Sequence, residues 1–286
     1  MTLLGAAEIR ALAAELDLKP AKALGQNFVI DSNICRKIVR LAGVTSDDVA
    51  LEIGPGLGSL TLALLEEVSS VIAIEIDTRL AEQLPITVAS HSERSGDLTV
   101  INQDALQVDQ LSNSPVAPTL LVANLPYNIS VPVLLHYLEK FPTLRSGIVM
   151  VQAEVADRLA AKPGSKDYGI PSVKAAWWAQ VSLAGTVSRS VFWPAPNVDS
   201  KLVSFIRHTS PADEKLRPLV FAAIDSAFSQ RRKMLRSVLK GWLGSSATVE
   251  SVLEKAGIDP TLRGEALEIE EYCSIARAVD QLAIGF

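Results

Sequence analysis

The chain has 286 residues, of which 48% are apolar and 21% are charged, so it can bury a sizeable hydrophobic core. This composition excludes a mostly disordered chain, and the absence of a long uncharged apolar run argues against a membrane-spanning helix. The formal net charge of −5 argues weakly against a polyanionic partner, unless basic residues are concentrated locally.

Two cysteines and three scattered histidines are too few to suggest a disulfide framework or a zinc site. We therefore expect no bound metal. The first twenty residues contain several charges and lack the basic start and the apolar run of a signal peptide. Together these features predict a soluble, cytoplasmic protein with no membrane segment.

Short apolar runs alternate with helix-like segments between residues 49 and 151. The runs predict strands at 49–53, 71–76, 98–101, 119–123 and 148–151, with helices near 58–68, 78–88, 105–111 and 130–140. Near-continuous β-branched runs separated by helices are typical of parallel strands that are covered on both faces. The sequence therefore predicts a doubly wound α/β domain, in which ligands bind at the carboxyl ends of the strands.

The C-terminal part of the chain has a different pattern. Two further apolar runs, at 181–187 and 201–206, could form an antiparallel edge of the sheet. The remaining residues show only helical patterning, at 214–229, 231–243, 247–256 and 270–283. We therefore predict a domain of residues 1–210, with an N-terminal helical extension at 1–45, and a small helical domain of residues 211–286.

A glycine-rich turn, Gly54-Pro55-Gly56-Leu57-Gly58, closes the first predicted strand and opens a helix. Glycines there let the backbone approach a ligand and leave free amide groups at a helix N-terminus. Glu75 ends the second strand, 21 residues after Gly54, where a carboxylate can accept hydrogen bonds from ribose hydroxyls. Asp104 follows the third strand and could accept from the amine of an adenine ring.

Two other interpretations of this turn are open. The site could bind a nicotinamide dinucleotide, but the spacing is G-x-G-x-G rather than G-x-G-x-x-G, and Pro55 removes an amide that pyrophosphate would use. Alternatively, Glu75 and Asp104 could merely cap loops. The glycine spacing resembles that of the S-adenosylmethionine site in class I methyltransferases.

The fourth strand runs into Asn124-Leu125-Pro126-Tyr127, beside the presumed cofactor. Pro126 fixes its own φ and restrains Leu125 to an extended geometry. An amide oxygen and a carbonyl oxygen can then accept both hydrogens of an aromatic amine, while a planar ring stacks on its base. An ordinary strand-to-helix turn is the alternative.

Asn-Leu-Pro-Tyr after a G-x-G-x-G strand resembles the adenine N6-methyltransferases. Three more segments narrow the resemblance to the ribosomal RNA adenine dimethyltransferase family of the KsgA type: Leu24-Gly25-Gln26-Asn27-Phe28, the segment 192–200 (FWPAPNVDS) and the segment 227–233 (AFSQRRK). The resemblance covers residues 20 to 285. It implies dimethylation of two adjacent adenines, at N6, in a hairpin near the 3′ end of 16S rRNA within the immature 30S subunit.

The resemblance also assigns roles to residues of this chain. The implied S-adenosylmethionine contacts are Asn27, Val29, Gly54, Gly56, Glu75, Asp104 and Asn124. The implied methyl-transfer residues are Asn124, Leu125, Pro126, Tyr127 and Phe192, with the two aromatic rings stacking on the target base. Trp193 has no assigned role, and we expect Trp177 and Trp178 to pack in the core. We also expect a monomer.

Residues 229–240 carry five positive charges and no acid. Helical spacing would place Arg232, Arg236 and Lys240 on one face, which could be merely solvated. The resemblance instead implies that Arg231, Arg232, Lys233 and Arg236 contact RNA. Two other functions stay open from the sequence: a non-catalytic assembly factor that binds pre-ribosomal RNA, and a nicotinamide-dependent oxidoreductase.

Overall fold

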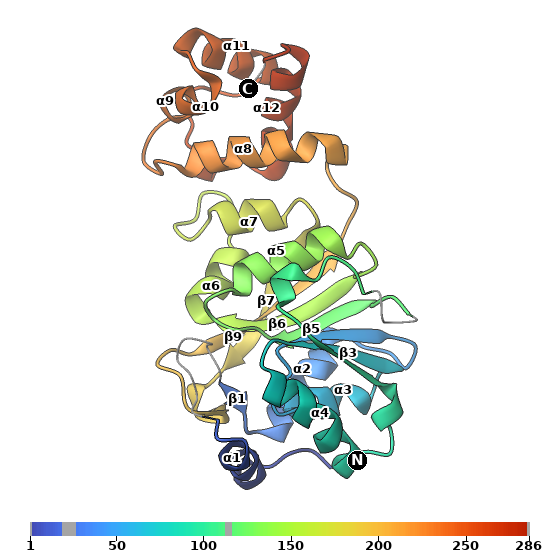
Figure 1. Ribbon diagram of the computed structural model, residues 1–286. Helices are drawn as coiled ribbons and strands as arrows, with labels where there is room; N and C mark the ends of the chain where they lie inside the picture. The colour runs from blue at the N-terminus through green and yellow to red at the C-terminus, as the bar shows by residue number, and fades with distance from the viewer. Residues whose placement is uncertain (1, 19–26, 112–115, 285–286) are drawn as a thin grey trace. The chain divides into compact units, whose positions relative to one another are not determined.

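The computed structural model describes residues 2–18, 27–111 and 116–284. The chain forms two compact units (Figure 1). Unit 1 comprises Met1–Ala156 and Ser182–Arg207, and unit 2 comprises Asp157–Val181 and His208–Phe286. The sequence placed a boundary at 210, which is close to the start of the second segment of unit 2. It did not foresee that residues 157–181 belong with the helical unit.

Unit 1 is built around a mostly parallel sheet. Within the described residues its strands follow the order β4-β3-β2-β5-β6-β9-β7. The first five strands are parallel, and β9 pairs with β6 in antiparallel register, as expected for an edge. Their bounds are β2 Val49–Ile53, β3 Ser70–Glu75, β4 Leu98–Asn102, β5 Leu120–Asn124, β6 Ser146–Gln152, β7 Ala179–Val187 and β9 Ser200–Arg207.

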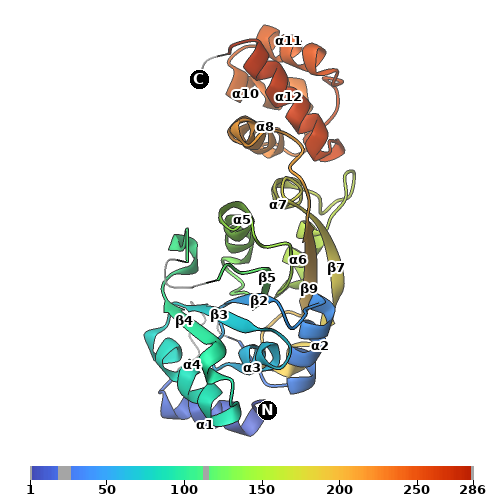
Figure 2. The same cartoon turned by 90° about the vertical axis from the view of Figure 1, so that its right-hand side faces the viewer.

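Helices cover both faces of this sheet, which confirms the predicted doubly wound α/β fold. Strands β2 and β3 are buried almost throughout, because each is apolar on both faces. Figure 2 shows α2, α3 and α4 on one side of the strands and α5 on the other. The bounds are α2 Ser32–Ala42, α3 Ser59–Leu65, α4 Thr78–His91, α5 Ser130–Lys140 and α6 Ala153–Leu159.

One helix predicted between these strands does not form. The segment predicted at 105–111 contains only a single 3-10 turn, Ala105–Gln107, which begins where the Asp104 side chain accepts from the amide of Leu106. Val108 is already extended after that turn. A short side-chain cap of this kind stabilises one turn but does not extend a helix.

The N-terminal extension contains the predicted helices and one short strand. Helix α1, Ala6–Glu15, precedes β1, Phe28–Val29, and β1 pairs with β8, Phe192–Trp193. The sequence did not predict this small sheet, because strands of two residues have no periodicity. The segment Leu24-Gly25-Gln26 of the first family motif lies outside the described residues.

Unit 2 is helical. Its helices are α7 Ile170–Ala175, α8 Arg217–Phe228, α9 Leu235–Val238, α10 Lys240–Leu243, α11 Ser246–Ala256 and α12 Ile269–Gln281. Trp177 and Trp178 are buried, as predicted, and their rings pack edge-on against Phe221 of α8. The indole nitrogen of Trp177 donates to Glu214, so the segment 157–181 is fixed to the helices of unit 2.

The predicted single helix at 231–243 is wrong. Residues 229–233 form a turn, and Met234 is extended with ψ 153°. The amides of Leu235 and Arg236 donate to the carbonyls of Leu262 and Pro260 rather than to the preceding turn. A partner from another segment thus satisfies the donors that a continuous helix would use.

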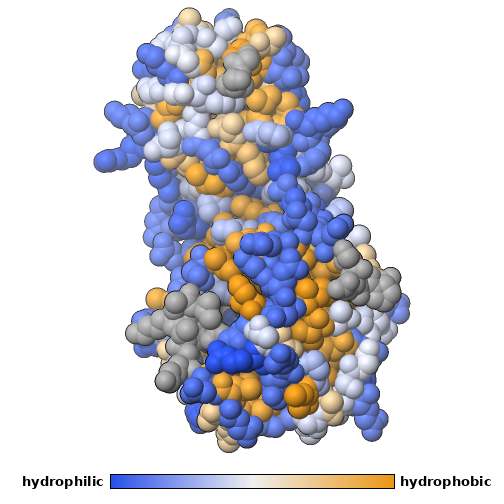
Figure 3. Space-filling model, viewed as in Figure 1, coloured by the Kyte–Doolittle hydropathy of each residue, from blue (hydrophilic) through white to orange (hydrophobic). Residues whose placement is uncertain are grey.

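The surface of both units is mainly hydrophilic on the face shown in Figure 3, with apolar patches on each unit. Among the described residues, no helix is both long and apolar enough to cross a membrane.

Candidate active site

A cavity of about 290 Å³ opens in unit 1 at the carboxyl ends of β2, β3 and β5. Eight of the residues singled out from the sequence line it: Asn27, Val29, Gly54, Gly56, Glu75, Asp104, Asn124 and Pro126. They come from five separate segments of the chain. The parallel sheet brings four of these segments together because the carboxyl ends of its strands meet at one edge. The fifth segment, with Asn27 and Val29, includes β1 of the small two-stranded sheet.

The glycine turn forms the floor of the cavity, and it requires glycine. Gly54, Gly56 and Gly58 have φ of 67°, 59° and 98°, a region that other residues rarely adopt. A Cβ on Gly56 would also lie 3.0 Å from the Phe28 ring, and one on Gly58 would lie 2.8 Å from Leu84. The turn therefore combines a left-handed backbone with close packing.

Glu75 is buried at the end of β3. Its Oε2 accepts from the amide of Gly56 at 3.2 Å, and its Oε1 accepts from the amide of Asp77 at 3.0 Å. Burial raises the pKa of Glu75, although these two amide donors oppose the shift. Each oxygen has a second lone pair, so the carboxylate can still accept from a ligand.

Asp104 lines the opposite part of the cavity and caps the short 3-10 turn through Oδ1. The loop-capping alternative is thus correct in part for both acids, since each binds backbone amides. It does not exclude ligand binding, because both carboxylates also line the cavity.

The sequence drew no attention to Glu52, which also lines this cavity. Its side chain is buried, and its Oε2 accepts a 2.6 Å hydrogen bond from the Thr61 hydroxyl. Burial raises the pKa of Glu52 to about 8, and the nearby Glu75 carboxylate adds to the shift. The sequence signal that could have identified Glu52 is an acidic residue within the otherwise apolar strand that precedes the glycine turn.

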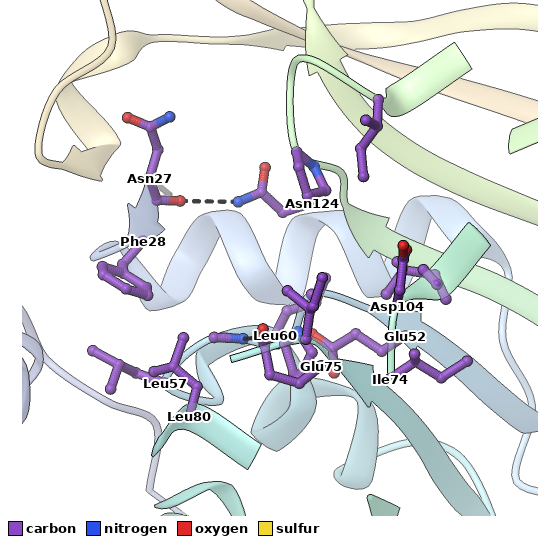
Figure 4. Close-up of a pocket in the computed structure, with 18 of the residues that line it drawn as sticks. Asn27, Phe28, Glu52, Leu57, Leu60, Ile74, Glu75, Leu80, Asp104 and Asn124 are labelled. Carbon is purple, nitrogen blue, oxygen red and sulfur yellow. Dashed lines mark hydrogen bonds between the residues drawn. The ribbon is translucent and has the colours of Figure 1, made fainter. Parts of the chain in front are cut away.

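Apolar side chains complete the cavity, including Phe28, Leu57, Leu60, Ile74 and Leu80, which Figure 4 shows around it. Phe28 stacks on Trp193 of the neighbouring strand at 6.4 Å between ring centroids. Ile76, directly after Glu75, is 56% exposed although it is a large apolar residue. An exposed apolar side chain at a cavity is suited to cover a flat ring.

Asn124 has the most informative environment in the site. Its Nδ2 donates to the main-chain carbonyl of Asn27 at 3.0 Å, as drawn in Figure 4. Its Oδ1 is buried and has no hydrogen-bond partner within the described residues. A buried acceptor without a hydrogen-bond donor costs free energy. We therefore expect a ligand to supply the donor for this oxygen.

The other predicted methyl-transfer residues differ in position. Leu125 is buried, and its amide donates to the Met150 carbonyl, which holds the start of the turn against β6. Tyr127 is half-buried, and its hydroxyl lies 2.7 Å from the hydroxyl of Ser200. Phe192 is only 3% exposed, packs in the hydrophobic core and does not line the cavity.

The basic residues predicted to contact RNA all lie in unit 2, but not on one helix face. Arg231 and Arg232 are in the turn after α8, Lys233 follows them, and Arg236 is in α9. All four are exposed. The expected common face of Arg232, Arg236 and Lys240 does not exist, because the helix is broken at Met234.

The side chain of Arg231 makes contacts that stabilise the fold of unit 2. It forms an ion pair with Glu265 at 2.8 Å and donates to the Ser165 carbonyl at 3.2 Å. These contacts join three segments, around residues 165, 231 and 265. They bring the exposed Lys166 and Arg263 into the same region, which the sequence could not show because the two residues are 97 positions apart.

Within the described part of the chain, no group of three or more His, Cys, Asp or Glu residues is placed to hold a metal ion. The polar groups around the cavity are instead carboxylates, side-chain amides and backbone groups, set among apolar side chains. This combination fits a nucleoside-containing ligand.

The fold and this cavity define a class I S-adenosylmethionine-dependent methyltransferase. The chain belongs to the ribosomal RNA adenine dimethylase family, whose model matches residues 18–281. It is 57% identical over 276 residues to a ribosomal RNA small subunit methyltransferase A from Streptomyces avermitilis, covering 96% of this chain and 93% of that protein. It is 58% identical to the protein of that name from Leifsonia xyli subsp. xyli, covering 96% and 98%.

Solved structures agree on the fold. A dimethyladenosine transferase from Plasmodium falciparum matches with a TM-score of 0.74 at 24% identity, over 89% of this chain and 98% of that chain. The 23S rRNA methyltransferase ErmE matches with a TM-score of 0.65 at 24% identity, over 89% and 100%.

Proposed function

We propose that this protein transfers methyl groups from S-adenosylmethionine to the N6 amines of two adjacent adenines, in a hairpin near the 3′ end of 16S rRNA. The relatives named above are small-subunit rRNA methyltransferases and are more than half identical over nearly the whole chain. We further propose that the substrate is the immature 30S subunit, that the protein acts as a monomer, and that it works in the cytoplasm.

The observation that carries this proposal is the buried Oδ1 of Asn124, for which the described part of the chain offers no hydrogen-bond partner. Because Nδ2 donates to Asn27, the amide must present its oxygen on the other side. An adenine N6 amine offers the hydrogen-bond donor that this oxygen lacks. The backbone carbonyl of Leu125 or Pro126 would accept the second hydrogen.

S-adenosylmethionine supplies an activated methyl group on sulfur, so the protein has to position the amine and stabilise charge. Asn124 would hold the amine so that the nitrogen lone pair is not delocalised into the ring and can attack the methyl group. Tyr127 would stack on the base. No general base is required, because the nitrogen becomes strongly acidic once the methyl group is bound. The base must leave its stack, or be unpaired already, to reach Asn124.

The cofactor would be held by the residues around the floor of the cavity. Glu75 would accept from the ribose hydroxyls, Asp104 would accept from the adenine amine, and the backbone of Gly54 and Gly56 would approach the ligand closely. Asn27 and Val29 would contribute main-chain groups, although the Val29 carbonyl already accepts from the Ser59 hydroxyl. Phe28 and Ile76 would cover apolar parts of the cofactor.

RNA would bind unit 2 through a basic cluster, which we define as Arg232, Lys233, Arg236 and Arg263. Each of these side chains is exposed, so phosphate can reach it. Arg236 also lies near Asp259, whose pKa is lowered mainly by the Thr261 hydroxyl and to a smaller extent by this arginine. The main role of Arg231 would be to stabilise the arrangement of this cluster through its ion pair with Glu265, rather than to contact phosphate.

The test is incubation of the full-length protein with radiolabelled S-adenosylmethionine and small subunits that lack the modification. We expect label in 16S rRNA, recovered as N6,N6-dimethyladenosine from two adjacent positions. Asn124→Ala is the matched negative control. Tight binding to the subunits without any methylation by the wild-type protein would instead favour a non-catalytic assembly factor.

A further inference from the structure

The side chain of Tyr127 is tied to a distant strand. Its hydroxyl lies 2.7 Å from the Ser200 hydroxyl, 73 residues later in the chain. Ser200 is fully buried at the first position of β9, whereas Tyr127 is half-buried in the turn after β5. The hydrogen bond thus joins an irregular segment to a regular one.

The position of Ser200 is fixed by the sheet. It is paired with Gln152, the last residue of β6, and the preceding Asp199 accepts from the amide of Ala153 through its carbonyl at 3.0 Å. The side chain of Asp199 also accepts from the amide of Arg189 at 3.3 Å. These contacts fix the backbone at Ser200 and at the residue before it, and so fix the Ser200 end of the hydrogen bond.

The bond crosses the end of one strand. Strand β6 lies between β5 and β9, so β9 is about 10 Å from β5 at the usual strand spacing. The tyrosine side chain therefore extends from β5 across the end of β6, toward β9. Meanwhile Pro126, Asn128 and Ile129 of the same turn line the cofactor cavity, and Tyr127 does not.

We propose that Ser200 is a positioning residue for methyl transfer, because its hydroxyl fixes the ring of Tyr127 in the orientation that stacks on the target adenine. This inference rests on the proposed function, in which Tyr127 contacts the base. With the hydroxyl held at one end and the backbone at the other, the two side-chain torsions of the ring are set before RNA binds. Ordering a free side chain on binding lowers affinity by roughly 2- to 10-fold.

The experiment uses Ser200→Ala, Tyr127→Phe and the double variant of the full-length protein, with unmethylated small subunits as substrate. Each single variant should lower kcat/KM for the subunits by roughly 2- to 10-fold. The double variant should be no worse than either single one, since both remove the same bond. Calorimetry should give an unchanged cofactor affinity for all three.

Ser204→Ala is the matched control, because Ser204 lies on the same strand and its hydroxyl donates only a long 3.4 Å bond to the Ser182 carbonyl. It should keep the wild-type kinetics. Additive losses in the double variant, or wild-type kinetics in Ser200→Ala, would overturn the inference. If Ser200→Ala fails to fold, wild-type kinetics in Tyr127→Phe would overturn it equally well.

Failure of the proposed function has a different signature. It appears as an absence of methylation by the wild-type protein, before any variant is compared. A Tyr127→Ala variant with wild-type kinetics for the subunits, beside an inactive Asn124→Ala, would remove only the stacking role of Tyr127 and with it the role of Ser200.

Discussion

The amide nitrogen of Asn124 lies 3.0 Å from the carbonyl oxygen of Asn27, which is 97 residues earlier in the chain. This single bond fixes the plane of the Asn124 side chain from the main chain of the N-terminal segment. The carbonyl can only accept, so the assignment of nitrogen and oxygen in the amide follows directly. The side chain is therefore oriented before any ligand binds.

Asn124→Ala should lower methyl transfer by at least ~10²-fold, the scale seen when a preorganised polar contact is lost. The cofactor dissociation constant should change much less, since the unpaired oxygen is assigned to the target amine. Single-turnover kinetics and calorimetry on the same preparation separate the two effects. Asn27→Ala keeps the carbonyl that Asn124 uses, so it should retain most activity. A loss in Asn124→Ala that weaker cofactor binding fully explains would make Asn124 a cofactor ligand only.

Glu75→Ala should weaken S-adenosylmethionine binding by about 1.5–3 kcal/mol, the range for hydrogen bonds to a charged group. Part of this loss reflects the amides of Gly56 and Asp77, which would lose their acceptor. Glu75→Gln keeps one carbonyl oxygen in place and should lose less. Calorimetry with all three proteins checks this order, and equal affinity in wild type and Glu75→Ala would remove Glu75 from the site.

Glu52 should make the folded state less stable as the pH rises. Burial holds its folded-state pKa at about 8, above the ordinary value of 4.5. Its contribution is therefore fully present below pH 4.5 and is lost as the pH rises to about 8, because the unfolded chain releases the proton first. Glu52→Gln keeps an acceptor for the Thr61 hydroxyl but has no proton to release.

Urea unfolding at pH 5 and pH 8 measures this effect. Between these values, wild type should lose a few kcal/mol more unfolding free energy than Glu52→Gln, since one pKa unit corresponds to about 1.4 kcal/mol. Groups that titrate elsewhere affect both proteins alike. Parallel declines in the two proteins would mean that Glu52 is ionised in the folded state throughout this range.

Replacing both Arg232 and Arg236 with Gln should weaken RNA binding and flatten its salt dependence. Each lost phosphate contact reduces the log–log slope by ~0.7 to ~0.9, so the pair should reduce it by roughly 1.4–1.8. Cofactor affinity should stay unchanged, because every described residue that lines the cavity belongs to unit 1. The measurement is subunit binding across a salt series.

Lys215→Gln is a suitable control for this measurement. Lys215 is exposed and precedes α8, whereas the basic cluster follows the end of that twelve-residue helix. Its replacement should leave the slope unchanged. An unchanged slope with weaker binding in the double variant would assign the two arginines to folding or base contacts. No change in either quantity would mean that these arginines are merely solvated.

The sequence predicted the parts of the structure that local patterns determine. The strands are continuous apolar runs, and the turn at Gly54 and Gly56 needs residues that tolerate positive φ, so both were visible without a structure. The cofactor cavity followed from them, because parallel topology fixes where the strand ends meet. The position of Asn124 and Glu75 beside the cavity was predictable for the same reason, since each ends one of these strands.

Features that depend on distant partners were missed or wrong. The helix predicted at 231–243 has good periodicity, but the carbonyls of Pro260 and Leu262 capture its first amides. Phe28 was known only as part of a motif, and its place against Gly56 depends on the pairing of β1 with β8. A local sequence pattern cannot show that residues distant in the chain will make these hydrogen bonds and contacts.

The polypeptide passes between the two units three times, at 156/157, 181/182 and 207/208. Cutting after residue 207 would therefore keep all of unit 1, together with residues 157–181 of unit 2 separated from the rest of that unit. It would leave Tyr168 and Trp177 without the Leu267 carbonyl and the Glu214 carboxylate to which they donate. Exchanging the helical unit between homologous enzymes thus requires grafting two pieces together, with residues 157–181 carried alongside the C-terminal helices. No single cut of the chain would release both units intact.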